Sequence, residues 1–116
     1  MKDLVLEAVD DAKGQNPRVL DVRGLTDITD FMVVVTGTSD RHIKSVAERV
    51  ADALRERGCR PLGTEGEDSR DWVLIDFGDV VVHVMTVATR AFYDLERLWG
   101  VDLRAHMEAR RERGGD

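Results

Sequence analysis

The residues whose types and positions come nearest to a chemical site are Gly37, Thr38 and Ser39. They lie between an apolar run and a segment with helical periodicity, so their backbone N–H groups and the helix dipole could bind a phosphate. Nucleotidyltransferases use a Gly-Ser motif in such a place, together with two carboxylates spaced D-x-D or D-x-E on the next strand for two magnesium ions. Here the next segment is helical, and the later acids Asp76 and Asp79 are separated by a turn. We therefore expect at most a vestigial phosphate loop, with no metal site and no cofactor, and a nucleotide enzyme is the less favoured interpretation.

The stretch DFGDVVVHVM, residues 76–85, contains a kinase-like Asp-Phe-Gly triplet and a lone histidine. A kinase also needs a glycine-rich loop, a strand lysine and an HRD loop, and the sequence has none of these motifs. The triplet is better explained as the turn of a β-hairpin, with Gly78 in the left-handed region and Asp76 and Asp79 in solvent. For His83 we expect a hydrogen bond donated to a neighbouring backbone carbonyl or carboxylate, rather than catalysis.

The other candidate ligands and nucleophiles are scattered along the sequence. His42, His106 and Cys59 show no metal-ligand spacing with one another or with His83, so no metal site is predicted. The single cysteine rules out an internal disulfide and fits a reducing cytoplasm, and it is best explained as a partly buried small apolar residue. There is no G-x-S-x-G motif either. Enzymatic activity is therefore not expected.

Five of the six aromatic residues lie from residue 72 onward, and four of these are candidates for a binding surface or for the core: Trp72, Phe92, Tyr93 and Trp99. Helical spacing places Phe92 and Trp99 on the inward face of a C-terminal helix, where they would join the core. Tyr93 points about 100° away from Phe92, and Trp72 begins a strand beside a polar loop, where a large ring is rarely fully buried. Exposed Trp and Tyr side chains with acidic neighbours are typical of a protein-binding hot spot, although half-buried packing aromatics explain the spacing equally well.

The elements that would position these residues are predicted by apolar periodicity. Helices are predicted at 2–13 and at 38–58, the second with Thr38 or Ser39 as N-cap and Gly58 at its end. Strands are predicted at 19–22, 72–77 and 79–85, with a central strand at 31–37 and a short edge strand within 60–71. A last helix is predicted at 89–100. This order indicates a single α/β domain with a mixed β-sheet flanked by helices.

Composition and charge limit the class of partner. The chain has 116 residues, of which 42% are apolar and 34% charged, which suits one globular domain. No apolar run approaches the roughly 20 residues of a membrane span, and the acids near the N-terminus are unlike a signal peptide. The formal charge is −6, and because residues 104–116 contribute +1, the preceding residues carry −7. Phosphate backbones repel such a domain, so we expect no direct nucleic-acid binding, whereas a basic protein partner is compatible with the charge.

Three blocks of the sequence, DVRGLTDITDFMVVVTGTSDRH, DWVLIDFGDVVVHVM and FYDLERLWG, closely resemble the ribosomal silencing factor family, also called Iojap-like. The resemblance extends to about Leu103, which indicates a domain at 1–103 and a charged tail at 104–116. It implies a fold related to nucleotidyltransferases without their catalytic carboxylates. It also implies a cytoplasmic translational repressor that binds the fourteenth protein of the large ribosomal subunit and blocks subunit joining when nutrients run short. A homodimer is implied for the free protein.

The resemblance also assigns interface residues. Trp72 and Tyr93 match the interface aromatics of the family. The residues expected around these two are Asp76, Met85, Leu95 and Glu96. Two alternative functions remain open at this point. An assembly factor for the large subunit would use the same contact, and a nucleotide-binding or nucleotidyl-transferring enzyme would use residues 37–39.

Overall fold

The computed structural model describes residues 1–25, 27, 29–66 and 71–93 of the chain. Its elements follow the predicted order. They are α1 (Lys2–Asp11), β1 (Gln15–Asp21), β2 (Phe31–Thr36), α2 (Asp40–Glu56), β3 (Gly63–Glu65), β4 (Trp72–Asp76), β5 (Val80–Met85) and α3 (Val87–Tyr93). Within the described ranges, no helix has the length and apolar content needed to cross a membrane.

Five strands form one mixed sheet in the order β1-β2-β5-β4-β3. β2 and β5 are parallel, and the other neighbouring pairs are antiparallel. β2 has a neighbour on each side, as its two-sided apolar sequence predicts, and β3 is the expected short edge strand. The register pairs Trp72 with Met85 and Leu74 with His83, so these four side chains lie on one face of the β4–β5 hairpin.

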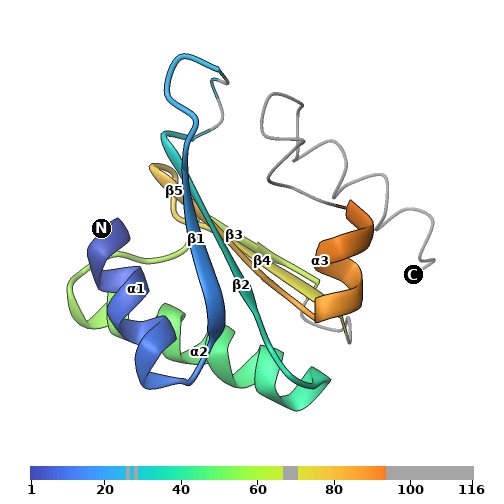
Figure 1. The fold of residues 1–116 in the computed structure, drawn as a ribbon. Coiled ribbons are helices and arrows are strands. Elements are labelled where there is room, and N and C mark those ends of the chain that lie inside the picture. Colours follow the sequence, from blue (N-terminus) through green and yellow to red (C-terminus); the bar gives the residue numbers. More distant parts are fainter. Residues whose placement is uncertain (26, 28, 67–70, 94–116) are drawn as a thin grey trace.

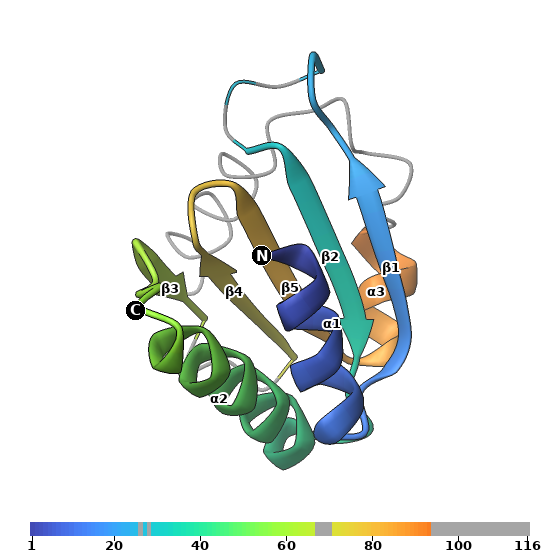
Figure 2. The same ribbon diagram turned by 90° about the vertical axis from the view of Figure 1, so that its left-hand side faces the viewer.

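Helices lie on both faces of the sheet, which confirms the predicted α/β fold (Figure 1). α1 and α2 cover one face, whereas α3 lies on the other (Figure 2). Alternate residues of β2 belong to different cores: Val33 and Val35 join the larger core with α1 and α2, and Val34 joins a smaller core on the opposite face. The smaller core consists of Val22, Met32, Val34, Trp72, Leu74, Val81 and Met85.

The two ends of α2 agree with the sequence. Ser39 is the N-cap, and its side-chain Oγ accepts a hydrogen bond from the backbone N–H of His42 over 3.1 Å. Gly58 follows the helix with a φ of +82°, the left-handed conformation in which glycine commonly ends a helix. The residues that α2 buries form the predicted stripe, which consists of Ile43, Val46, Ala47, Val50 and Leu54.

β1 begins at Gln15, four residues before the predicted strand at 19–22. The helix stop predicted in KGQNPR is confirmed, because α1 ends at Asp11, but most of this stretch is strand. Asn16 has a φ of 49°, and the pairing with β2 shifts between Gln15 and Arg18. This irregularity lets the strand continue through Pro17, which has no N–H to donate.

The hairpin turn between β4 and β5 differs from its prediction at one residue. Gly78 has the predicted left-handed conformation, with a φ of +90°, and Asp79 is exposed. Asp76 was expected in solvent and is only 5% exposed, so that prediction is wrong. Its Oδ1 accepts a hydrogen bond from the backbone N–H of Gly78 over 2.8 Å, which holds the carboxylate against the turn.

α3 begins at Val87, two residues before the predicted start. Phe92 was predicted to lie in the core, yet it is 80% exposed, so that prediction is wrong. The side of the helix that packs against the fold carries the buried Thr89 and the half-buried Arg90 instead. The remainder of the predicted helix, residues 94–100, lies outside the described residues.

Candidate functional site

Trp72, the first of the expected interface aromatics, is hydrogen-bonded to His83. The indole Nε1 donates to Nδ1 of His83 over 3.1 Å, and the two ring centroids are 5.9 Å apart. Because an indole nitrogen can only donate, Nδ1 is unprotonated, and the proton of the neutral imidazole lies on Nε2. The imidazole is fully buried, and this burial lowers the pKa of His83 to about 4.

The second imidazole nitrogen of His83, Nε2, has no hydrogen-bond partner among the residues that the structure describes. We expected His83 to donate a hydrogen bond to a backbone carbonyl or a carboxylate, and among the described residues this prediction is wrong. The side chains paired with His83 across the sheet are Val34 and Leu74, which are apolar. A neutral histidine in these surroundings packs in the core and is not placed to transfer a proton.

Three of the expected interface residues are buried. Trp72 and Met85 have no exposed surface, and Asp76 is 5% exposed. The expectation that Trp72 is exposed is wrong, because the hairpin register places its ring on the inward face together with Leu74 and Met85. The assignment of these three residues to a partner interface stays a prediction.

The other expected interface residues lie at or beyond the end of the described chain. Tyr93 is the last described residue of α3, and its side chain lies outside the description. Leu95 and Glu96 are also outside the described residues. Their assignment to the interface likewise stays a prediction.

A guanidinium group anchors α3 to the sheet. Nη1 of Arg90 donates to the carbonyl oxygen of Asn16 over 2.7 Å and to the hydroxyl of Thr36 over 3.0 Å. These acceptors belong to β1 and β2, so one side chain connects the helix to two strands. Sequence reasoning missed this role, since the partners are 74 and 54 positions away and no local pattern marks them.

A second polar cluster fixes the start of α3. Thr86 Oγ1 accepts from the backbone N–H of Thr89 over 3.3 Å and donates to the hydroxyl of Thr89 over 3.0 Å. That hydroxyl donates in turn to Oδ2 of Asp71 over 3.2 Å. The threonine immediately before an apolar helical stretch is an N-cap signal that could have been recognised in the sequence. Its link to Asp71 required the tertiary structure.

The loop at residues 37–39 is arranged to join β2 to α2. The backbone N–H of Gly37 donates to the carbonyl oxygen of Met85 over 2.8 Å, and that of Thr38 donates to Nδ1 of His42 over 2.9 Å. Ser39 caps the N–H of His42. Protein acceptors therefore occupy N–H groups that a phosphate would otherwise use, and the cap explains the Gly-Thr-Ser sequence without a ligand.

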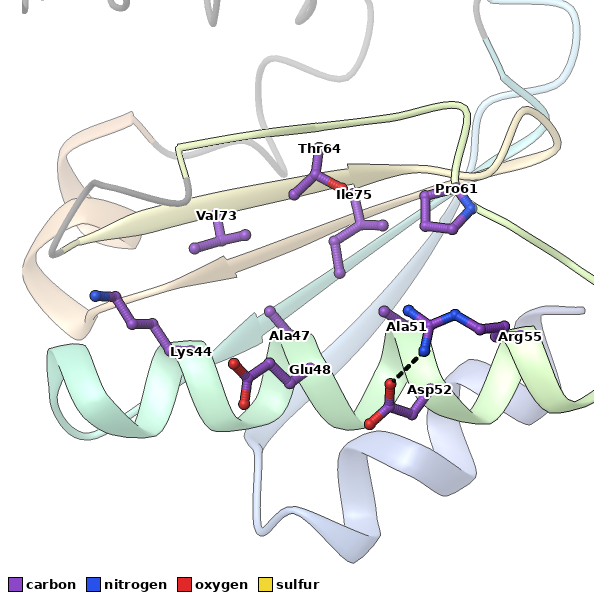
Figure 3. A pocket seen from close by; sticks show the side chains of 10 residues that line it. All are labelled: Lys44, Ala47, Glu48, Ala51, Asp52, Arg55, Pro61, Thr64, Val73 and Ile75. Atoms are coloured by element: carbon purple, nitrogen blue, oxygen red, sulfur yellow. Dashed lines mark hydrogen bonds and ion pairs between the residues drawn. The ribbon is translucent and has the colours of Figure 1, made fainter.

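A groove of about 310 Å³ lies between α2 and strands β3 and β4 (Figure 3). Its floor is apolar and includes Val73 and Ile75, and its rim on α2 is charged. Two of the rim residues, Asp52 and Arg55, are bound to each other over 2.9 Å. The lining contains no histidine, cysteine or serine, and the described part of the chain has no cluster of three or more metal-ligating side chains. The titratable groups with acid–base potential in the groove are the carboxylates of Glu48 and Asp52 and the amine of Lys44, and Asp52 is paired with Arg55.

Both the sequence and the fold of this chain are similar to those of known proteins. The family model described as "Ribosomal silencing factor during starvation" matches residues 1–114. A ribosomal silencing factor of Chromobacterium violaceum is 47% identical over 97 residues, which cover 84% of this chain and 80% of that protein. The crystal structure of a protein from the same species superimposes with a TM-score of 0.83 at 46% identity, covering 87% of this chain and 84% of its own.

A mouse protein named "Mitochondrial assembly of ribosomal large subunit protein 1" is 38% identical over 74 residues. The match covers 61% of this chain and 32% of the mouse protein. The range of the family model, 1–114, continues past Leu103, where the resemblance seen in the sequence ended. The division into a domain at 1–103 and a tail at 104–116 stays a prediction.

Proposed function

The chain belongs to the ribosomal silencing factor family, and we propose that it represses translation by binding the large ribosomal subunit and sterically blocking the joining of the small subunit. The fourteenth protein of the large subunit is the proposed contact, and nutrient limitation is the proposed condition, in line with the words "during starvation" in the family description. The observation that carries this proposal is the family match over residues 1–114, together with 47% identity to a silencing factor.

The contacts at the candidate sites support a binding role rather than an enzymatic one. The Gly37–Ser39 loop is used as a helix cap, and His83 is a neutral core residue. The groove beside α2 lacks a histidine, cysteine or serine. The carboxylates that line the groove, Glu48 and Asp52, belong to no cluster of three or more metal-ligating side chains within the described residues. We therefore propose that the protein acts through its surface and without a cofactor.

The charge of the chain supports a basic protein as the partner. The formal charge is −6, from 23 acids and 17 bases. An acidic surface is attracted to a basic protein and repelled by ribosomal RNA, which favours a protein contact on the subunit over an RNA contact. Association that depends on such charge complementarity weakens as salt is added.

The residues that the resemblance placed in the interface remain part of the proposal. They are Trp72, Asp76, Met85, Tyr93, Leu95 and Glu96. The first three are buried, so we propose that they shape the contact surface from beneath instead of touching the partner. We propose that the last three make direct contact. Homodimer formation by the free protein and a cytoplasmic location also belong to this proposal.

Sedimentation of purified large and small subunits tests the proposed function. The protein should migrate with the large subunit and reduce the fraction of joined ribosomes in proportion to its concentration. Binding without any effect on joining would contradict the repressor function. The absence of binding to large subunits would contradict the ribosomal role as a whole.

A role in assembly of the large subunit is the second candidate, and the name of the mouse relative is the observation that favours it. Depleting the protein distinguishes the two functions. An assembly factor should leave large-subunit precursors when it is depleted in growing cells. A silencing factor should leave subunits intact and instead increase translation during starvation.

A further inference from the structure

The groove beside α2 lies on one face of the sheet, and Trp72 and α3 lie on the other (Figure 2). Its floor includes Val73 and Ile75 of β4, which belong to the larger core. Successive side chains of a strand point to opposite faces, so these two residues point away from the side on which Trp72 is buried. The groove is therefore a separate surface from the one around Trp72 and α3.

The walls of the groove come from α2 and from the chain that leads into β3. On α2, Ala47 and Ala51 are one turn apart and carry only methyl groups, so space remains between the helix and the strands. The strand side carries Pro61 and Thr64 (Figure 3). The space has a volume of about 310 Å³. An apolar side chain offered from outside would be buried against the floor of this groove.

β3 is the last strand of the sheet, and its outer side has no strand neighbour within the described residues. Proteins commonly obstruct such edges with proline, bulges or charge, because an open edge can pair with another chain. β1, the opposite edge, contains Pro17 and a shift in pairing between Gln15 and Arg18. β3 contains no proline, and its pairing with β4 starts at Gly63 without a shift. The edge beside the groove is therefore the more accessible of the two.

The occupant that complements a strand edge is another extended backbone. Leu62, directly before β3, is 75% exposed, so an added strand would also gain apolar contact there. The exposed rim of the groove carries two bases and two acids, which are Lys44, Arg55, Glu48 and Asp52. This balanced rim does not attract a polyanion, and the chain's charge of −6 repels one. A small molecule would be held by the groove alone, whereas a polypeptide would bind the groove and the edge together.

We propose that the β3 edge and the groove together bind an extended segment of a second protein, which adds to β3 as a further strand. Neighbouring strands are about 4.8 Å apart, so the added strand lies two such spacings from the floor on β4. A long apolar side chain, such as leucine, methionine or phenylalanine, is needed to cover that distance. Because β3 has only three residues, this side chain must contribute much of the affinity and specificity.

This inference goes beyond the proposed function and does not depend on it. The groove lies on the α2 side of the sheet, away from Trp72 and α3, so the segment and the proposed ribosomal contact would not compete for one surface. The protein would then connect a second protein to whatever its other face binds.

Selection from a phage-displayed library of random linear peptides, with the full chain as target, tests the proposal. Enriched peptides should carry leucine, methionine or phenylalanine within a run of residues that favour strands. Titration of a labelled enriched peptide, followed by fluorescence anisotropy, gives its affinity. Amide hydrogen exchange should slow in β3 when this peptide is bound, because the added strand protects the edge. A selection without enrichment, or bound peptides that leave exchange in β3 unchanged, would overturn the proposal.

Two variants block the groove from opposite walls. Ala51→Arg extends a long side chain from α2 and keeps a good helix-forming residue, and Thr64→Arg does the same from β3. Each should lower the affinity for the peptide at least about tenfold. The matched control is Ser45→Arg, which adds the same charge at an exposed position of α2 outside the groove and should bind within about twofold of the unchanged protein. Circular dichroism and thermal melting check folding, and unchanged binding by either folded groove variant would overturn the proposal.

Two further readouts separate this proposal from its alternatives. Ala51→Arg should migrate with large subunits as the unchanged protein does, and if neither migrates while the unchanged protein binds the peptide, the proposed function fails and the groove proposal stands. Exchange in β3 that slows with rising protein concentration, in the absence of peptide, would mean that a second copy of this chain occupies the edge. That result would overturn the proposal.

Discussion

The indole N–H of Trp72 donates to Nδ1 of His83 across 3.1 Å, and both side chains are fully buried. The bond requires an unprotonated Nδ1, so it exists while the imidazole is neutral. A proton added to this nitrogen would remove the acceptor and leave a charge in the smaller core. The buried Trp72–His83 pair therefore makes the stability of the fold decrease as the pH falls.

The protein should lose stability as pH falls through the window between the two pKa values of His83. Burial lowers its pKa from the ordinary value of 6.5 to about 4 in the folded state. Between these values the unfolded chain binds the proton more readily, so the contribution is complete above pH 6.5 and is lost toward pH 4. The full difference corresponds to about 3 kcal/mol. Urea unfolding at pH 7.5, 5.5 and 4.5 measures this loss.

The variant His83→Gln is the control for that measurement. It removes the titrating group, so the pH dependence of its free energy of unfolding between pH 6.5 and 4 should be shallower than that of the unchanged protein. Equal slopes for the two proteins would mean that His83 is not the source of the pH dependence.

Replacement of Trp72 by alanine should destabilise the fold, in contrast to the effect expected for an exposed anchor. Truncating a fully buried aromatic leaves a cavity and costs about 3–5 kcal/mol. Trp72→Phe keeps most of the ring but removes the donor to His83, for an expected loss of about 1–3 kcal/mol. Urea unfolding followed by circular dichroism compares the three proteins. A Trp72→Ala protein as stable as the unchanged one would contradict the burial.

Gly37→Ala should destabilise the junction of β2 and α2. A Cβ atom at this position would lie 2.8 Å from Cγ1 of Ile43 and 3.1 Å from its backbone nitrogen, so the helix start has to shift. Overpacking of this kind costs about 1–3 kcal/mol. Gly63→Ala is the control, because a Cβ there meets nothing within 4 Å, and its effect should be within about 0.5 kcal/mol. Thermal unfolding compares the two variants. Equal decreases in their midpoints would mean that a Cβ at position 37 does not clash with Ile43.

Arg90→Met should loosen α3 from the sheet. The change removes the bonds to Asn16 and Thr36 and should cost about 1–2 kcal/mol for this half-exposed group. Relative to the unchanged protein, amide hydrogen exchange in Arg90→Met should accelerate in α3 more than in α2, because the lost hydrogen bonds hold only α3. The control is Arg49→Met, on the exposed side of α2. Unchanged exchange in α3 of Arg90→Met would mean that other contacts hold the helix.

The parts of the fold that could be predicted from the sequence are those with a local physical cause. The apolar stripe from Ile43 to Leu54 and the N-cap at Ser39 predict α2 from residues within or next to the helix itself. The two-sided apolar run of β2 identifies a strand with neighbours on both sides. Periodicity and capping act over short stretches, so neighbouring residues are sufficient to reveal them.

The candidate site could be predicted only in part. The sequence drew attention to Trp72 and Tyr93, but the burial of Trp72 depends on its pairing with Met85 across the hairpin. Periodicity alone placed Phe92 in the core. It could not show which side of α3 faces inward, because that is set by polar bonds from Arg90 to residues of β1 and β2.

Residue order and local pattern were thus sufficient for the succession of helices and strands, the single α/β domain and the family. The tertiary structure was required for strand register, for the Trp72–His83 bond and for the outward orientation of Phe92 on α3. The physical reason is the range of the interactions. A helix or strand pattern repeats every few residues, whereas register and helix rotation depend on contacts between residues that are distant in the chain and meet only in the folded protein.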